Sequence, residues 1–498
     1  MKKINKYLIF SFLVAFITLL ITSKNSFIYV FNDWVDANSF FTVGKSIFNG
    51  LVPYKDIFEH KGPLLYFIYG IGYLMSHKTF HGVFILEVIS LTIFLYYIHK
   101  VFSLYFDKKY SLVLLPALSM MMSISIFFFH GGSCEEFCLP FIGVSLYYYI
   151  KHFKSEKLSN KEILINGLMA GIVLMTKYTL LGFWIAFGLF ICISYLKNKE
   201  FKKIFIFCGL FLLGMIIPFI LVLIYFLINK GVKEFINVYF IFNITAYGSS
   251  EHYGIVRKVY KILKYIYSLL MEVKPLGVLL ILPFILAFFT KEKDRIFRLS
   301  LVCMPYITFF FIAFGLKTYI YYHLPVYLLS IILIEIFVSK LFKKYIDKII
   351  NKKYFIILLI IYLLGILFLT YRYANYKEYI TMKKEDLVQY KYASYIKKTK
   401  NPTLLNMGFL DIGVYTLAEI VPNTRFFMVH NISYDKFKDN LDEMEKYVRN
   451  REIKFIVYST LYGEEPPEYI YDNYELVYND HYVYESHDFT SYLFELKK

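Results

Sequence analysis

The sequence is poor in charged residues. Only 19% of its 498 residues are charged, whereas 58% are hydrophobic and the mean hydropathy is +0.51. Soluble domains carry about 25% charged and about 45–50% apolar residues, so this composition excludes an ordinary soluble enzyme. A disordered chain is excluded for the same reason, and only 24 glycines and 13 prolines exclude a fibrous one.

Cysteine is also scarce. Three of the five cysteines, Cys192, Cys208 and Cys303, lie in apolar runs, and only Cys134 and Cys138 flank a polar loop. Two thiols four residues apart on a helix usually lie too far apart to bridge. The sequence therefore predicts no disulfide framework, and it also lacks internal repeats and low-complexity linkers.

What the chain has instead is long apolar blocks. About 20 apolar residues in a helix cross ~30 Å of hydrocarbon, and this measure gives about eleven candidate spans. They are 7–23, 80–99, 111–129, 137–150, 163–176, 179–196, 204–228, 275–290, 299–315, 319–339 and 354–370. The first follows three lysines, lacks a small-residue cleavage site and precedes many others, which favours a retained signal-anchor over a cleaved signal peptide. The pattern predicts a polytopic α-helical membrane protein.

Basic residues predict its orientation. Alternate loops, at 1–6, 100–110, 151–161, 197–203, 291–298 and 340–353, hold 24 of the 55 lysines and arginines. By the positive-inside rule these loops are cytoplasmic, which puts the N-terminus inside and the tail 371–498 outside. The tail carries 17 basic and 20 acidic residues, so the net charge of +17 arises in the membrane part. This distribution indicates anchoring at the inner leaflet rather than nucleic-acid binding.

The outer side holds three long segments. Two are the loops 24–79 and 229–274, which we assign with the spans to a transmembrane domain, 1–370. The third is the tail, 371–498, in which 403–407, 425–429 and 454–458 read as strands and 434–450 as an amphipathic helix, followed by β-rich segments at 474–485 and 490–496. The tail is predicted to be a small extracytoplasmic α/β domain.

Ionisable residues gather at the outer ends of the spans. The first group lies in 33–63 and contains Asp33, Asp36, Asp56, Glu59, His60 and Lys61. A carboxylate held within hydrogen-bonding distance of a hydroxyl can act as a general base, and Lys61 beside Gly62-Pro63 could meet a phosphate. Spacing alone favours a solvated loop whose acids have no such role.

A second group is HGGSCEEFCLPF at 130–141. Glu135 and Glu136 lie in a short outer loop, with His130 nearby. These acids either occupy the first turn of a helix, where its dipole favours them, or bind a metal or sugar hydroxyls. The residues leave both readings open.

A third group lies on 255–269. Arg257, Lys258, Lys261 and Lys264 fall on one side of a helical pattern that is apolar on the other, which is typical of an interfacial helix. Membrane adhesion is the simpler interpretation. Lys177 and His323 lie at other outer span ends, where a lysine usually extends to the interface and a histidine usually has a local hydrogen-bond partner, although either could contact a lipid-linked phosphate.

Taken in order, these motifs resemble the membrane glycosyltransferases of the GT-C superfold, a group that includes protein O-mannosyltransferases and aminoarabinose transferases of lipid A. The likeness rests on Asp36, on Asn49–Asp56 and on Glu59–Tyr66, which are similar to an acidic residue, a G-x-P-Y-x-D turn and a K-P-P-L-x-Y helix start. Glu135-Glu136, Tyr322–Pro325 and Asp411–Tyr415 resemble further elements. The chain departs from the family pattern at Ala37 and Gly62.

The resemblance implies a GT-C-like fold that transfers a hexosyl or pentosyl group from a polyprenyl-phosphate donor to an acceptor outside the membrane, with inversion. Asp36 would be the catalytic base. Acceptor or sugar contacts would come from Asp33, Asp56, Glu135 and Glu136, and donor-phosphate contacts from Lys61, Lys177, Arg257, Lys258 and His323. A divalent metal, as in some relatives, would be held by Glu59, His60 and His252.

Two other classes remain open from the sequence. A flippase of lipid-linked saccharides would need polar residues near the bilayer midplane, where only Glu87 and Glu335 occur. A membrane protein whose tail captures a wall polymer would make no use of the first-loop acids. For the transferase we expect a bacterial plasma membrane, membrane lipids and an envelope glycan or protein acceptor as partners, and no nucleic acid.

Overall fold

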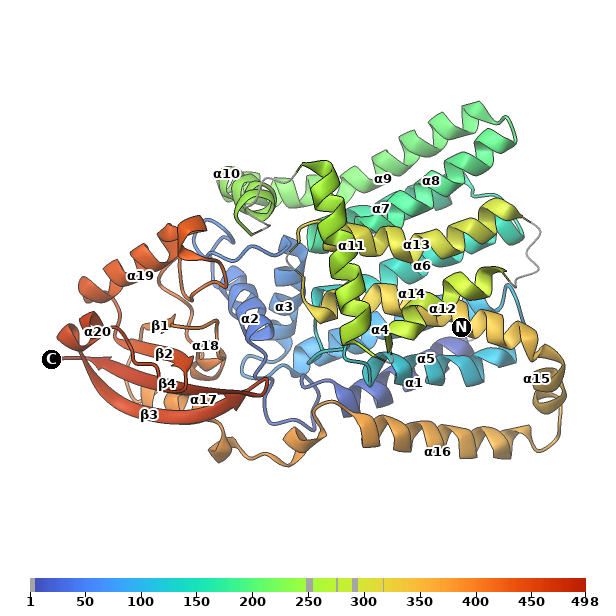
Figure 1. Cartoon of the computed structure of the whole chain (residues 1–498). Coiled ribbons are helices and arrows are strands. Elements are labelled where there is room, and N and C mark those ends of the chain that lie inside the picture. The colour runs from blue at the N-terminus through green and yellow to red at the C-terminus, as the bar shows by residue number, and fades with distance from the viewer. Residues whose placement is uncertain (1–4, 248–253, 275, 289–293, 317) are drawn as a thin grey trace. The chain divides into compact units, whose positions relative to one another are not determined.

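The computed structural model describes residues 5–247, 254–274, 276–288, 294–316 and 318–498. The chain is mostly helical (Figure 1). It divides into two compact units, each built from three segments. Unit 1 is Met1–Ser23, Leu86–Leu223 and Glu251–Lys377, and unit 2 is Lys24–Ile85, Ile224–Ser250 and Glu378–Lys498.

Unit 1 is a helical bundle, and two of the divisions between the units fall within α4 and α9. Its elements are α1 (Lys6–Thr22), α4 (His81–Phe102), η1 (Lys108–Tyr110), α5 (Ser111–Ser123), α6 (Cys134–Lys154), α7 (Asn160–Lys177), η2 (Tyr178–Leu181), α8 (Gly182–Lys197), α9 (Phe201–Ile228), α11 (Ile255–Glu272), α12 (Leu276–Phe288), α13 (Arg295–Ala313), η4 (Ile320–His323), α14 (Leu324–Leu341), α15 (Lys343–Ile350) and α16 (Phe355–Tyr373).

Each of the eleven predicted spans coincides with one of these helices. By length and composition, six helical segments among the described residues could cross a membrane: 81–102, 160–197, 201–228, 295–313, 320–341 and 355–373. The segment 160–197 contains both α7 and α8, which run antiparallel, since Lys151 and His152 near the end of α6 contact the start of α7 (Glu162) and the end of α8 (Tyr195). The multi-pass character is therefore confirmed, whereas the count of eleven stays a prediction.

The loops predicted to be cytoplasmic meet at one end of unit 1. The Tyr110 hydroxyl donates to Asp347 at 2.8 Å, Lys157 pairs with Glu200 at 2.5 Å, and Lys197 lies 3.8 Å from Asp294. These contacts join the loops that follow α4, α6, α8, α12 and α14. That these loops lie at one end of unit 1 agrees with the sequence prediction that they are on the same side of the membrane.

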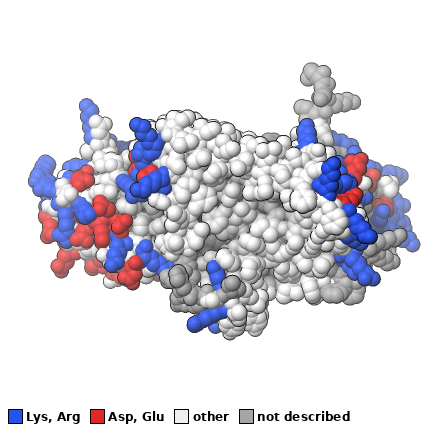
Figure 2. All heavy atoms as spheres, turned by 90° about the horizontal axis from the view of Figure 1, so that it is seen from above, with Lys and Arg blue, Asp and Glu red and all other residues white. Residues whose placement is uncertain are grey.

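The sides of unit 1 expose apolar side chains. On α9 these include Phe205 and Leu221, and on α16 Ile356 and Phe368, each more than 60% exposed. Figure 2, which views the molecule from the side of α9, shows a broad surface almost without charged side chains, with charged residues, mostly lysines and arginines, at the end of the helical bundle. A helix that is apolar all round and still exposed is typical of contact with lipid.

Unit 2 combines short helices with one sheet. Its helical elements are α2 (Val35–Phe48), α3 (Pro63–Met75), α10 (Val232–Phe235), the π-helix η3 (Ile236–Tyr247), η5 (Lys377–Thr381), η6 (Lys384–Asp386), α17 (Val388–Ile396), α18 (Val414–Ala418), η7 (Tyr434–Lys436), α19 (Lys438–Arg449) and α20 (Glu468–Asn473). Its strands are β1 (Leu404–Met407), β2 (Phe455–Leu461), β3 (Tyr474–Tyr484) and β4 (His487–Leu496).

The sheet has the strand order β1-β2-β4-β3. β1 pairs with β2 in parallel, whereas β2–β4 and β3–β4 are antiparallel. The predicted strands at 403–407 and 454–458 and the two late β segments are present, as is the amphipathic helix. The strand predicted at 425–429 is wrong: only one isolated bridge, Asn406 to Met428, forms there. The backbone oxygens of the segment bond outside the sheet, since Arg425 accepts from the Phe58 N–H at 2.8 Å and Met428 from the Asn440 side chain at 3.1 Å.

The first outer loop is a helical hairpin. α2 and α3 pack at a crossing of two glycines, where a Cβ on Gly44 would lie 2.5 Å from the backbone nitrogen of Gly70. Pro63 at the first position of α3 suits a helix start, because its missing N–H would have no helical partner. This close packing sets the position of the residues before α3 relative to α2.

Candidate active site

Asp36 lies in the first turn of α2 and is half-buried. The positive end of the helix dipole favours an ionised carboxylate there. Phe40 follows one helical turn later, and the Lys61 ammonium lies 5.8 Å from the centre of its ring. Residues four apart share a helix face, so Asp36 and Lys61 lie along the same side of α2.

The segment between α2 and α3 is a tight turn. The Asp56 carboxylate accepts a hydrogen bond from the Val52 N–H at 2.8 Å, and the Tyr54 hydroxyl donates to the Lys61 carbonyl at 2.6 Å. Tyr54 has a positive φ of 68°, and Arg425 donates to its carbonyl oxygen at 3.0 Å. The G-x-P-Y-x-D motif thus builds a rigid support for residues 59–61, and Asp56 is part of that support.

Glu59, His60 and His430 form a buried cluster, which we call the His-Glu cluster. Each offers one ligand atom, and these atoms all lie within 4.8 Å of one another. The Tyr66 hydroxyl and the Lys61 N–H both donate to the Glu59 carboxylate. A carboxylate with two imidazoles is a donor set that zinc and similar divalent cations prefer.

Electrostatics fix the charge state of this cluster. Burial alone would raise the pKa of Glu59, but Lys61, His60 and the Tyr66 hydrogen bond together lower that pKa to about 2. Burial, followed by the charge of Lys61, holds the pKa of His60 well below its ordinary value. The cluster therefore contains an ionised carboxylate and a neutral imidazole, the forms that bind metals.

Asp33 makes a buried ion pair with Lys24, whose side chain is fully buried. The Lys24 ammonium also lies 3.5 Å from the centre of the Tyr379 ring. Asp33 therefore neutralises an internal cation, in addition to any role toward a substrate.

In unit 1, Lys177 lies 3.0 Å from Glu135 and 3.3 Å from the centre of the Tyr322 ring. Glu136 accepts from the Gly132 N–H at 2.8 Å, while its own N–H bonds to the Ser133 hydroxyl that caps α6. Both glutamates thus lie in the first turn of a helix, and Lys177 contacts one of them. Cys134 and Cys138 on the same helix are both buried and are not joined by a disulfide.

The other candidates of unit 1 are spread over α11 and η4. His323 is fully buried, and its Nε2 lies 2.8 Å from the Tyr265 hydroxyl. On α11, Arg257 is exposed, and the Lys258 ammonium lies 3.7 Å from the centre of the Phe314 ring. His252 lies outside the described residues.

Within unit 2 the structure brings together Glu59, His60 and Lys61, with Asp36 one helical turn from the Phe40 ring that Lys61 approaches. Within unit 1 it brings together Glu135 and Lys177. The residue that the sequence did not single out is His430, which joins the cluster where His252 was expected. Its only sequence signal is a histidine just after an apolar run, which by itself predicts nothing. Asn243, which contacts His60, was likewise missed.

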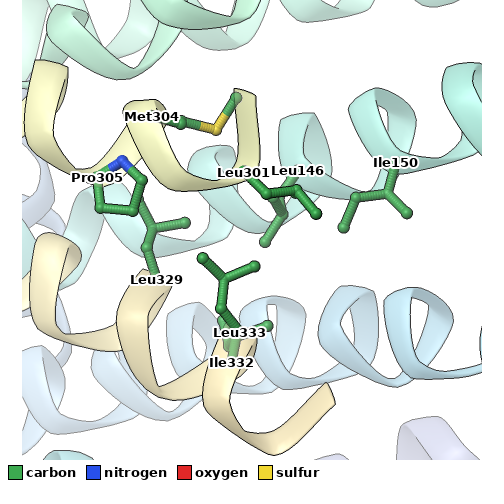
Figure 3. Close-up of a pocket in the computed structure, with 8 residues that line it drawn as sticks. All are labelled: Leu146, Ile150, Leu301, Met304, Pro305, Leu329, Ile332 and Leu333. Atoms are coloured by element: carbon green, nitrogen blue, oxygen red, sulfur yellow. The ribbon is translucent and has the colours of Figure 1, made fainter. Parts of the chain in front are cut away.

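A small cavity in unit 1 is no alternative site. Side chains from α6, α13 and α14 converge on it in Figure 3, among them Leu146, Met304 and Leu333, and its volume is about 10 Å³. That is room for one water molecule at most, and an apolar lining of this kind leaves such a cavity dry. It reflects imperfect packing beside Pro305.

Comparison with known proteins bears on the fold. Residues 60–229 match the family model described as dolichyl-phosphate-mannose-protein mannosyltransferase. Five chains of solved structures match, among them ArnT from Cupriavidus metallidurans in its crystal structure bound to undecaprenyl phosphate. That match has a TM-score of 0.62 and 13% identity, and covers 98% of this chain and 97% of that one. A search of curated proteins found no match. The chain therefore has the fold of a GT-C membrane glycosyltransferase, as the motifs of its first outer loop implied.

Proposed function

We propose that this protein transfers a sugar from a polyprenyl-phosphate donor to a hydroxyl group of an acceptor outside the membrane. The observation that carries the proposal is the side of α2 shared by Asp36 and Lys61, in a chain whose fold matches ArnT along nearly its whole length. A carboxylate and a cation on one side of a helix suit a reaction in which a hydroxyl loses its proton while a phosphate leaves.

In the proposed reaction the acceptor oxygen attacks the anomeric carbon from the side opposite the phosphate. The bond from that carbon to the acceptor oxygen forms as the bond to the phosphate oxygen breaks, which inverts the anomeric centre. Asp36 takes the hydroxyl proton, and the polyprenyl phosphate leaves with the bonding electrons. Lys61 offsets the negative charge that grows on the leaving phosphate.

The His-Glu cluster supports a divalent cation in this site, held by Glu59, His60 and His430. The fit rests on the donor set and on the three ligand atoms lying within 4.8 Å of one another. A cation there would supply Lewis-acid stabilisation of phosphate charge. Lys61 lies 3.8 Å from the same Glu59 carboxylate, so the charges of Lys61 and of a bound cation would both act on the donor phosphate.

The other predicted contacts belong to the same proposal. Lys177, His323 and the basic side of α11 would contact the donor phosphate or lipid headgroups, and Asp33, Asp56, Glu135 and Glu136 the sugar or the acceptor. The basic end of unit 1 would face the cytoplasm, which places the N-terminus inside and the tail outside a bacterial plasma membrane.

The proposal is tested with the purified full-length protein in lipid vesicles that contain polyprenyl-phosphate sugars with a labelled sugar. Mass spectrometry of envelope glycans from cells with and without the protein first identifies the acceptor. With that acceptor present we expect labelled product and one polyprenyl phosphate released for each sugar transferred. Movement of intact donor lipid across the bilayer, without cleavage of the sugar–phosphate bond, would instead identify a flippase.

A further inference from the structure

Asn243 lies in the π-helix η3 and is only 8% exposed. π-helices are rare, and those that occur are often found at functional sites. Asn243 is not one of the three proposed metal ligands, although its side chain contacts His60.

Hydrogen bonds fix the orientation of the Asn243 amide. Its Nδ2 donates to the carbonyl oxygens of His60 at 2.7 Å and Tyr239 at 2.9 Å. With the NH₂ group held by two backbone oxygens, the Oδ1 atom lies 3.0 Å from Nδ1 of the His60 ring.

This orientation determines the tautomer of His60. An amide oxygen can only accept a hydrogen bond, so the Nδ1 of His60 must carry the hydrogen. In a neutral imidazole the other nitrogen then has the lone pair. That nitrogen, Nε2, lies 3.8 Å from the Glu59 carboxylate.

We propose that Asn243 is a positioning residue that holds His60 in its Nδ1–H form, so that the Nε2 lone pair is presented to a divalent cation in the His-Glu cluster. The inference rests on the metal site of the proposed function. Partners of this kind orient a metal-binding histidine, and their loss typically lowers metal affinity about 10–100-fold.

The first test measures Zn²⁺ binding to metal-stripped, full-length protein by competition with a chromophoric chelator. Asn243→Leu removes the acceptor, and we expect it to bind Zn²⁺ about 10–100-fold more weakly than the native chain. Asn243→Asp keeps an oxygen that accepts from the same Nδ1–H but loses the donor to the His60 and Tyr239 carbonyls, so it should recover part of that loss. His430→Ala and Glu59→Ala should weaken binding as well.

Asn406→Leu is the matched control. Asn406 is also a buried asparagine of unit 2, and its Nδ2 donates to two carbonyl oxygens, of Phe409 and Leu410, at 2.8 Å. Its loss should leave Zn²⁺ affinity unchanged. Native affinity in Asn243→Leu, or equal losses in Asn243→Leu and Asn243→Asp, would overturn the inference.

A second test needs no Asn243 variant and so does not depend on its folding. In ¹⁵N-histidine-labelled, metal-free protein, the His60 signals are identified by their absence from His60→Gln. We expect a protonated Nδ1 and an unprotonated Nε2, and the reverse pattern would overturn the inference.

The outcomes also separate this inference from the proposed function. A chain that transfers sugar but binds no Zn²⁺ would contradict the metal site and the role of Asn243 while leaving the transferase intact. A chain with the expected Zn²⁺ affinities and no sugar transfer would contradict the proposed transferase while supporting the metal site and the role of Asn243.

Discussion

The two units bury charge in different ways. In unit 1 the outward side chains of α9 and α16 are apolar, and the pair Glu135–Lys177 joins the ends of successive helices. In unit 2, buried ionisable groups join segments hundreds of residues apart in the sequence, as in the cluster of His60 with His430. The exposed surface of unit 1 is therefore suited to contact with lipid, whereas unit 2 brings together the buried ionisable groups that can bind a ligand or take part in a reaction.

The substitution of Asp36 should have the largest effect, and it tests whether unit 2 holds the reacting groups. Asp36→Asn should reduce sugar transfer about 10²–10⁴-fold, because an amide cannot take up the proton of the attacking hydroxyl group. Asp480→Asn is the control, since Asp480 pairs with Lys391 at 2.6 Å, away from the residues of the proposed reaction. Initial rates with saturating donor compare the two variants, and equal rates for Asp36→Asn and the native chain would remove Asp36 from the mechanism.

Breaking the buried pair of unit 2 should have the next largest effect. Lys24→Met leaves the Asp33 carboxylate buried without its cation, and we expect a loss of about 3–5 kcal/mol in the free energy of unfolding. The double variant Lys24→Met/Asp33→Leu should recover most of this loss. Urea unfolding in detergent measures both, and a Lys24→Met variant as stable as the native chain would show that the pair adds little.

The helix hairpin that supports the site should be sensitive to one methyl group. A Cβ on Gly44 would lie 2.5 Å from the Gly70 backbone nitrogen and 2.8 Å from the Tyr66 carbonyl oxygen, neither of which can rotate away. Gly44→Ala should therefore destabilise the protein by about 1–3 kcal/mol.

Gly209 on α9 offers the matched comparison in unit 1. A Cβ there meets nothing within 4 Å, so Gly209→Ala should be neutral or slightly stabilising. Thermal unfolding compares the two variants, and equal effects at the two glycines would contradict the close packing of α2 on α3.

Counted per pH unit, the smallest predicted effect is a pH dependence of stability. Burial lowers the pKa of Lys45 to about 7, although Asp411 and Glu419 oppose the shift. Between about pH 7 and pH 10.5 the unfolded chain binds the proton more tightly, so stability should fall as the pH falls, by up to about 1.4 kcal/mol per unit, and then level off below pH 7.

Lys45→Met should remove the contribution of Lys45 and so make this slope shallower. Lys55→Met should keep it, because Lys55 is only partly buried and donates to the Asn229 carbonyl. Unfolding free energies across pH 7–10 give the measurement, and an unchanged slope in Lys45→Met would contradict the assignment.

Local patterns predicted much of the fold. The apolar runs of unit 1 predicted helices because a run that must satisfy its own backbone in lipid can only be helical. The sheet segments 403–407 and 454–458 were also found, since β-branched and aromatic residues favour strands. The segment 425–429 has the same character, but it forms only one bridge, because Phe58 and Asn440 donate hydrogen bonds to its backbone oxygens.

The candidate site was only partly predictable. Glu59, His60 and Lys61 are consecutive, so their proximity could be read from the sequence. His430 lies 370 residues from His60 and Asn243 lies 183 away, and no periodicity connects residues so far apart. Likewise nothing in the spacing indicated that Asp33 pairs with Lys24.

The proposed reaction depends most on which face of the membrane unit 2 occupies. An impermeant thiol reagent applied to right-side-out vesicles tests this directly, with Tyr462→Cys in unit 2, Asn198→Cys between α8 and α9, and the native chain as background. Both positions are exposed. We expect Tyr462→Cys to react in sealed vesicles and Asn198→Cys only after permeabilisation, whereas the reverse pattern would place Asp36 in the cytoplasm, away from any external acceptor.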